Sequence, residues 1–225
     1  MAARSQSLPE PAPIPPAERL PLNSGDRLTR VEFHRRYRQH PEIKKAELVE
    51  GVVYVASPVS FKHSSHHSGA TRWLGAYADV HPEVEIQTNV SLILDGDNEV
   101  QPDLCMYYGD GRSARAGDDG YLHGAPELVI EISISSASYD LHSKLNAYRR
   151  NGVQEYIVWR VFDAAIDWFE LVEGAYRAIA PDERGIVHSG VFPGLRLDRE
   201  KMLTGDLTSV LAEQRRATAA RSKRG

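Results

Sequence analysis

The stretch from Glu127 to Ile134 constrains the fold most, because its residues alternate with the period of a β-strand. Side chains alternate across a strand, so one face of this stretch is wholly apolar: Leu128, Ile130, Ile132 and Ile134. The other face carries the remaining four residues, Glu127, Val129, Glu131 and Ser133. A carboxylate in the middle of a central strand is costly to bury unless a positive charge meets it. The pattern therefore predicts a central strand with a cation beside Glu131.

A helix and a second strand follow this first one. Residues 138–150 predict a helix that ends at Asn151 and Gly152, and residues 155–161 predict the next strand. A strand, helix, strand unit of this kind predicts a parallel pair with a right-handed crossover.

Asp103 is the second candidate carboxylate. Residues 84–94 and 100–108 predict an antiparallel pair around a turn at 95–98, and Asp103 opens its second strand. Taken alone, Asp103 after Pro102 could be an ordinary turn residue. Two carboxylates that converge from neighbouring strands repel each other without a cation between them. Magnesium suits such oxygen ligands, and manganese can replace it, so we expect Asp103 and Glu131 to hold a divalent metal that activates water.

Lys144 is the third candidate, on the helix that follows Glu131. Leu141, Leu145 and Tyr148 form an apolar stripe on that helix, and Lys144 lies about 60 degrees from its centre. A long stem could run along the packed surface and deliver the ammonium to the sheet, with Asp140 holding it one turn away. The alternative is an ordinary solvated lysine paired with Asp140.

The rest of the chain predicts a single domain between two less structured ends. The 225 residues carry a net charge of -4, which argues against a protein that coats nucleic acid through bulk positive charge. Residues 1–24 predict a disordered Pro-rich leader, residues 25–206 the folded domain, and residues 207–225 a helix with a basic tail. The basic residues of that tail are Arg215, Arg216, Arg221, Lys223 and Arg224.

Further elements are expected on the pattern of apolar residues, caps and turns. A capping box at Thr29 and Glu32 predicts a helix to about His40. Beyond it we expect a hairpin (46–49 and 52–56), a long helix (63–79), a surface excursion (109–124) and a closing hairpin (165–171 and 175–179). A single cysteine, no signal-like start and no long apolar run favour a cytoplasmic protein that does not insert into membranes.

Taken in order, several short motifs resemble one family, the Uma-type restriction endonucleases of the PD-(D/E)XK superfamily. Resemblance extends from about Thr29 to Asp206. The motifs are Glu47 to Gly51, Ser57-Pro58 followed by His63, Gln101-Pro102-Asp103, Ala125 to Ser133, Asp140 to Lys144, and Tyr148 to Trp159. The resemblance implies an α/β (α+β) fold, namely a restriction endonuclease-like mixed β-sheet flanked by helices.

The resemblance also implies an endonuclease that cuts DNA phosphodiesters with metal-activated water, with Asp103 and Glu131 as metal ligands. His63 and Glu47 match recurrent family positions and are expected to line the cleft. One departure concerns the lysine that the superfamily places two residues after the glutamate, where this chain has Ser133. The resemblance then implies that Lys144, on the following helix, supplies the amine in place of that lysine. Since two cuts in a duplex need two sites, we expect a homodimer.

Other readings of the same residues stay open at this point. Ser133 in place of lysine could mark a nucleic-acid-binding module on a nuclease fold that has lost catalysis. Asp103 and Glu131 could instead serve as acid and base in a hydrolase of another class, as in glycosidases. His63 and His67, one helical turn apart, suggest a zinc site, but no third ligand has a fixed spacing.

Overall fold

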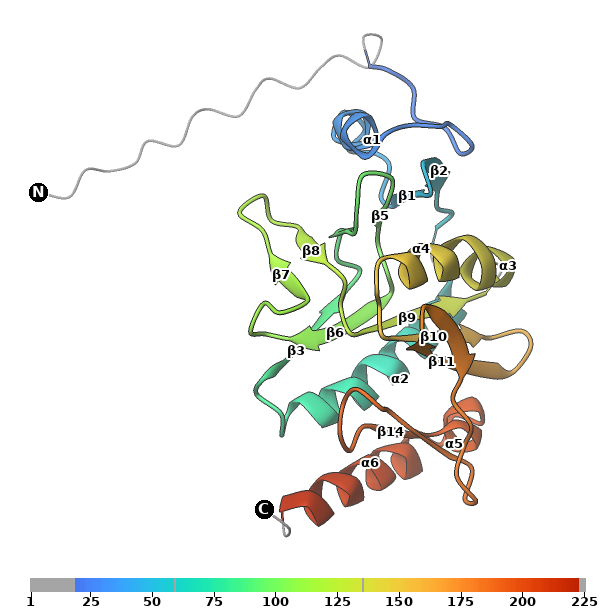
Figure 1. Cartoon of the computed structure of the whole chain (residues 1–225). Coiled ribbons are helices and arrows are strands. Elements are labelled where there is room, and N and C mark those ends of the chain that lie inside the picture. The colour runs from blue at the N-terminus through green and yellow to red at the C-terminus, as the bar shows by residue number, and fades with distance from the viewer. Residues whose placement is uncertain (1–18, 59, 135, 223–225) are drawn as a thin grey trace, which may run out of the picture.

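A computed structural model describes residues 19–58, 60–134 and 136–222, with side chains described as far as Arg216. Its central feature is a six-stranded mixed sheet in the order β12-β11-β10-β9-β6-β3 (Figure 1). The strands are β3 (Val84–Thr88), β6 (Leu104–Tyr108), β9 (Leu128–Ser133), β10 (Glu155–Arg160), β11 (Ala165–Val172) and β12 (Ala175–Ala178). Strand β9 lies inside this sheet, parallel to β10 and antiparallel to β6.

The alternation predicted for β9 is present and divides two hydrophobic clusters. Leu128, Ile130 and Ile132 belong to one cluster, together with residues of helix α2 (Phe61–Ala78). Val129 belongs to the other cluster, together with residues of helix α4 (Leu145–Arg150). In Figure 1, α2 lies on one side of the central sheet and α4 on the other. The face that carries Glu131 is therefore the one covered by α4.

A second six-stranded sheet lies on the α4 side, in the order β2-β1-β5-β4-β8-β7 (Figure 1). Its strands are β1 (Ala46–Val49), β2 (Val52–Val55), β4 (Leu92–Ile93), β5 (Glu99–Val100), β7 (Ala114–Ala116) and β8 (Leu122–Gly124). The hairpin predicted over 46–56 is thus confirmed as β1 and β2. The antiparallel pair predicted over 84–108 is confirmed in a single register, since β3 pairs with β6 and β4 with β5, although the two parts belong to different sheets. One expectation was wrong here. The excursion at 109–124 carries a hairpin of its own, in which Ala114 and Leu122 are buried.

The connection between β9 and β10 is not one uniform α-helix. It consists of a single turn α3 (Ala137–Tyr139), a π-helical turn η2 (Asp140–Lys144) and then α4. A π-turn is rare and widens the helix by one residue, which changes the direction of the side chains that follow. Asp140 and Lys144 are both buried at the ends of this turn.

The two ends of the described chain pack onto this framework. Helix α1 (Arg30–Tyr37) begins at Thr29, whose hydroxyl accepts from the Glu32 N–H, while the Glu32 carboxylate bonds Arg35 and Arg36. Leu22 is buried in a small cluster with Phe33, so packing starts before the predicted boundary at residue 25.

Near the C-terminus, β13 (Ile186–His188) and β14 (Arg196–Asp198) form a small two-stranded sheet. Helices α5 (Arg199–Leu203) and α6 (Leu207–Ser222) come last. Arg215 and Arg216 of the expected basic tail are described, the side chain of Arg221 is not, and Lys223 and Arg224 lie outside the described residues.

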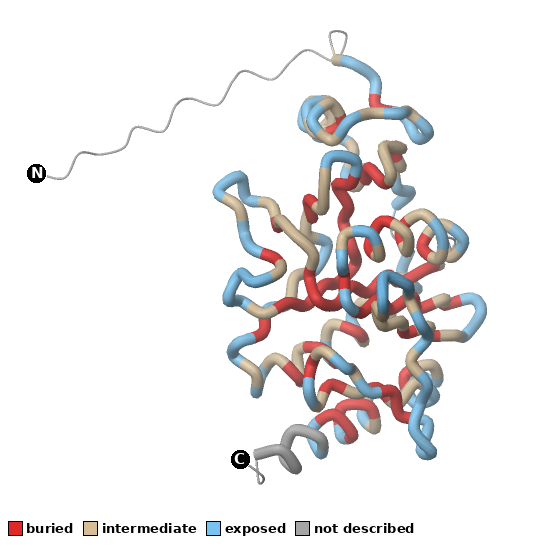
Figure 2. The backbone as a smooth tube through the Cα atoms, in the orientation of Figure 1, coloured by how far each residue is buried: buried red, intermediate tan, exposed pale blue. Residues whose placement is uncertain are grey.

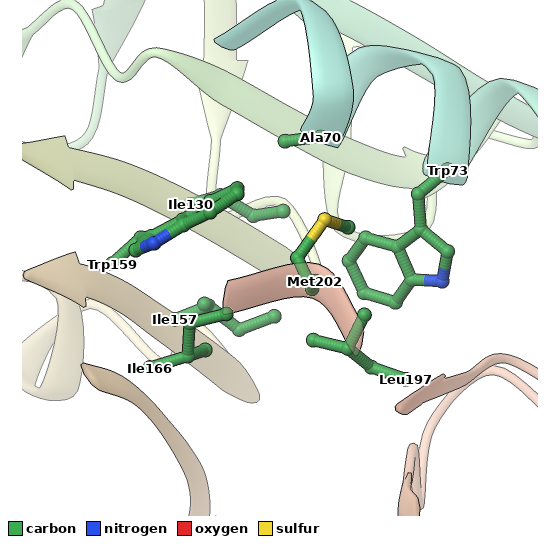
Figure 3. Close-up of a pocket in the computed structure, with 8 residues that line it drawn as sticks. All are labelled: Ala70, Trp73, Ile130, Ile157, Trp159, Ile166, Leu197 and Met202. Carbon is green, nitrogen blue, oxygen red and sulfur yellow. The ribbon is translucent and has the colours of Figure 1, made fainter. Parts of the chain in front are cut away.

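Burial is concentrated along the strands of the central sheet, whereas the loops at its edges are exposed (Figure 2). A small apolar cavity of about 10 Å³ lies on the α2 side, lined by Ala70, Trp73, Ile130, Ile157, Trp159, Ile166, Leu197 and Met202 (Figure 3). A space of this size holds about one water and offers it no polar partner. Within the described residues, no helix combines the length and the apolar character needed to cross a membrane.

Candidate functional site

Asp103 and Glu131 lie near each other at the central sheet. Strands β6 and β9 pair with Leu104 opposite Ile130 and Cys105 opposite Val129. Asp103 directly precedes β6, and its carboxylate accepts the N–H of Ile132, the residue after Glu131 on β9. Asp103 is also one of the charges that raise the pKa of Glu131. Both side chains are buried, at 4% and 3% exposure.

Asp103 is held by two hydrogen bonds and one longer ion pair. Its Oδ2 accepts the Ile132 N–H at 2.7 Å and lies 3.1 Å from His63 Nε2, while Lys45 Nζ is 3.7 Å from Oδ1. Burial alone would raise the pKa of Asp103, but the His63 hydrogen bond, the Lys45 charge and the Ile132 N–H together lower it to about 2. Asp103 is therefore a carboxylate throughout the neutral range.

Glu131 forms the centre of a second buried group with Lys144. The Lys144 ammonium donates to Glu131 Oε1 at 2.8 Å, and the Tyr148 hydroxyl donates to the same oxygen at 2.8 Å. Lys144 Nζ also lies 2.8 Å from Glu47 Oε1, so it bridges two acids. Burial raises the pKa of Glu131, and the charge of Lys144 opposes that shift. The pKa of Lys144 is raised by Glu131 and Glu47 in spite of burial, so the amine keeps its proton.

Elements from both sheets deliver these side chains. Glu47 comes from β1 of the second sheet, where its Oε1 also accepts the Gln101 N–H at 2.7 Å. Lys144 comes from the end of the π-turn, only 2% exposed. The site thus lies between the two sheets, beneath the helix that joins β9 to β10.

The helix reaches this site in a different rotation from the one predicted. The expected buried stripe was Leu141, Leu145 and Tyr148, but Leu141 and Leu145 are only half-buried. Asp140 and Lys144 take the buried positions instead, because the π-turn shifts the helical register.

Asp140 also has other partners than the one expected for it. Its Oδ2 accepts from Ser133 Oγ at 2.5 Å and from Ser136 Oγ at 2.6 Å, while Lys144 forms its ion pairs within the described chain with Glu47 and Glu131. Ser133, at the position where the superfamily has lysine, therefore anchors the turn that presents Lys144.

The histidines at the head of α2 adjoin Asp103. His63 Nε2 bonds the carboxylate, and His67 Nε2 lies 2.9 Å from the Asp103 backbone carbonyl oxygen. His63 Nδ1 is buried without a hydrogen-bond partner. Across the residues that the structure describes, no group of three or more histidine, cysteine or acidic side chains could hold a metal, which leaves a zinc site without support.

All five residues predicted for the site meet in one region. Two linked groups make it up: Asp103 with His63, and Glu131 with Lys144 and Glu47. Lys45 and the hydroxyl of Tyr148 were not predicted to belong to it. Lys45 precedes a strand by one residue and has no pattern that marks it. Tyr148 was expected only to fill the apolar stripe, although a buried tyrosine hydroxyl usually seeks a partner.

The donor set suits a hard divalent cation better than a soft one. Asp103 and Glu131 supply oxygen atoms, which magnesium prefers, and magnesium typically binds through one or two carboxylates and keeps several waters. Such a metal needs fewer protein ligands than the groups of three or more, of which the described part of the chain has none. Residues Asp103 and Glu131 are thus a chemically fitting pair for it.

Comparisons with known proteins agree on the class of the fold. A family model, Uma2, described as "Putative restriction endonuclease", matches residues 30–200. A crystal structure described as "a putative nuclease belonging to DUF820" from Anabaena variabilis superposes with a TM-score of 0.60 at 15% identity. The match covers 76% of this chain and 96% of that one. No curated protein matches the chain.

Proposed function

The chain belongs to the Uma2 family of restriction endonuclease-like proteins, and on that premise we propose that it is a metal-dependent endonuclease that hydrolyses DNA phosphodiester bonds. The restriction endonuclease-like fold expected from the sequence agrees with the nuclease fold of the structural neighbour. Fold alone does not determine chemistry, so the proposal rests on the site.

The observation that carries the proposal is the nearness of two buried acids: the Asp103 carboxylate bonds the N–H next to Glu131, and the Lys144 ammonium lies 2.8 Å from Glu131. Two buried acids close together repel each other unless cations accompany them. Lys144, Lys45 and His63 meet part of this charge. A divalent cation between the acids would meet the rest.

In this proposal Asp103 and Glu131 would hold magnesium, or manganese in its place. A bound divalent cation lowers the pKa of its water and neutralises charge that develops on a phosphoryl group. His63 and the Ile132 N–H keep the Asp103 carboxylate oriented and ionised. Lys144 keeps Glu131 in place and supplies a fixed positive charge for the anionic transition state. Glu47 holds the other side of the same ammonium.

The test is cleavage of supercoiled plasmid DNA with magnesium or manganese by wild type, Asp103→Ala and Lys144→Ala. We expect nicked and linear products from wild type and a cleavage rate that is lower by about 100-fold or more in Asp103→Ala. The cleavage rate of Lys144→Ala should also be lower than that of wild type. Asp110→Ala is the matched control, because Asp110 lies just beyond the other end of β6 and is exposed. Cleavage by Asp103→Ala at the wild-type rate would show that Asp103 is not a metal ligand needed for the reaction. The homodimer expected for double-strand cleavage is checked by sedimentation of the same samples.

The alternative is a nucleic-acid-binding module without catalysis. Two observations favour it: Ser133 stands where the superfamily has lysine, and Lys144 already occupies both Glu131 and Glu47. A binding module predicts that wild type binds DNA equally well in EDTA and in magnesium and cuts in neither. A shift of the wild-type binding curve with magnesium, together with cleavage, excludes this alternative.

A further inference from the structure

We propose that an aromatic ridge formed by Phe61, Lys62 and Phe162 stacks an unpaired base of the DNA substrate next to the candidate site. The inference rests on the proposed nuclease function and adds the substrate class, namely DNA with unpaired bases close to the scissile phosphate. It predicts a preference for single-stranded or distorted DNA over blunt, fully paired duplex.

The two phenylalanines are unusually exposed. Phe61 is 89% exposed and Phe162 is 68% exposed. The other exposed large hydrophobic side chains of the described residues are Leu20, Val31 and Val80. Stacking on bases requires an accessible aromatic ring, and both phenylalanines are exposed.

Lys62 lies over the ring of Phe162. Its ammonium lies 4.6 Å from the centroid of the Phe162 ring, within the range of a cation–π contact. Phe61 and Lys62 are consecutive at the start of α2, whereas Phe162 follows β10. Lys62 and Phe162, a hundred positions apart in the chain, thus lie in contact, and Phe61 is the neighbour of Lys62 in the chain.

The ridge adjoins the site through both of its elements. His63, the next residue after Lys62, bonds the Asp103 carboxylate at 3.1 Å. The residue before Phe162 is Val161, whose N–H donates to the Ser133 carbonyl at 3.0 Å, just beyond Glu131 on β9. A strand of DNA whose phosphate meets Asp103 would therefore have a neighbouring base within reach of the ridge.

Charge on the ridge matches a polyanion. The first turn of α2 carries no acidic residue, and a helix N-terminus attracts negative charge. Across the described residues, Lys62 forms no salt bridge, so its charge is available to a phosphate. The one acid beside Phe162, Asp163, is paired with Arg160. Aromatic faces with basic groups between them are typical of single-stranded nucleic acid binding.

The test is equilibrium binding by fluorescence anisotropy of the full chain in EDTA, where no cleavage occurs. Three probes of equal length are compared: a single strand, a duplex with a short unpaired gap, and a blunt duplex. Phe61→Ala and Phe162→Ala should each weaken binding of the first two probes by about 5-fold or more, and that of the blunt duplex by less than 2-fold. Phe61→Trp should keep wild-type affinity, because the ring face remains. Val31→Ala is the control, exposed on α1.

Each of the following outcomes would overturn the proposal that the ridge stacks an unpaired base. Unchanged binding by both alanine variants, while wild type still cuts plasmid, would refute the inference and leave the nuclease proposal standing. Equal losses on blunt duplex and on single strand would refute base stacking. Wild type that sediments as a dimer and Phe61→Ala that sediments as a monomer would assign the ridge to an interface between copies. Wild type that neither binds nor cuts any DNA would overturn both proposals together.

Discussion

Replacement of Lys144 by methionine tests the buried charge arrangement most severely. Lys144→Met keeps a long apolar stem but removes the ammonium that lies 2.8 Å from both Glu47 and Glu131. The two acids are then enclosed without a cation between them, at 6% and 3% exposure. We expect the variant to be less stable than wild type and to regain stability when magnesium is added.

The magnitude follows from the cost of an unpaired buried charge. Loss of one partner from a buried ion pair typically costs about 3–5 kcal/mol. A domain of this size has a total stability of about 5–15 kcal/mol, so the loss would be a large fraction of it. A metal that binds only the folded state returns about 1.4 kcal/mol at ten times its dissociation constant.

The assay is urea denaturation followed by tryptophan fluorescence, with EDTA and then with increasing magnesium. Lys201→Met serves as the control, because Lys201 is an exposed lysine on α5, and its change should stay within about 0.5 kcal/mol. A loss below about 1 kcal/mol in Lys144→Met would show that the lysine does not neutralise these acids in the folded protein.

Three further predictions concern the surroundings of the site. The pKa of Asp103 is lowered from 3.8 to about 2, so its ionised form stabilises the fold above pH 4 by about 2 kcal/mol. That contribution is lost as the pH falls towards 2. The free energy of unfolding in urea should therefore fall less steeply over this pH range in Asp103→Asn than in wild type. Burial raises the pKa of Cys105 to about 12, so a disulfide reagent should modify it only in urea, and rapid reaction of the native protein would contradict the burial. Ile130→Ala should lower the free energy of unfolding by about 2–5 kcal/mol while leaving the cleavage rate per folded molecule unchanged, because Ile130 faces α2, away from Glu131. Loss of cleavage in a folded Ile130→Ala protein would contradict that separation of the two faces.

Local periodicity predicted the parts of the site that depend on a single strand. The alternation in β9 gave the two faces correctly, and with them the burial of Glu131 on the side opposite Ile130. Side chains in a strand must alternate, so this inference needs no knowledge of tertiary structure.

The parts that depend on two distant segments were only partly predictable. The hairpin predicted over 84–108 keeps a single register, but its division between two sheets was not predictable, because β6 and β5 join sheets whose other strands come from distant parts of the chain. Glu47 was predicted as a site residue from the family resemblance alone, since an acid on a hairpin is usually a surface residue. Its role as a partner of Lys144 requires the second sheet to lie over the first.

The rotation of the helix could not be predicted from a 3.6-residue period. Five residues in a π-turn move Asp140 and Lys144 into the buried positions that the regular helix assigned to leucines. Polar contacts offset the cost of burying these two charged side chains. Ser133 and Ser136 donate to Asp140, and Lys144 pairs with Glu47 and Glu131. Such bonds replace the apolar packing on which periodicity arguments depend.

Titration of the purified protein with manganese, followed by isothermal calorimetry, tests the proposed metal site most directly. The proposal predicts saturable binding by wild type, weakened at least 10-fold in Asp103→Asn and in Glu131→Gln and unchanged in Asp110→Asn, whose exposed carboxylate lies beyond the other end of β6. Binding of equal affinity in wild type and in both site variants would contradict it.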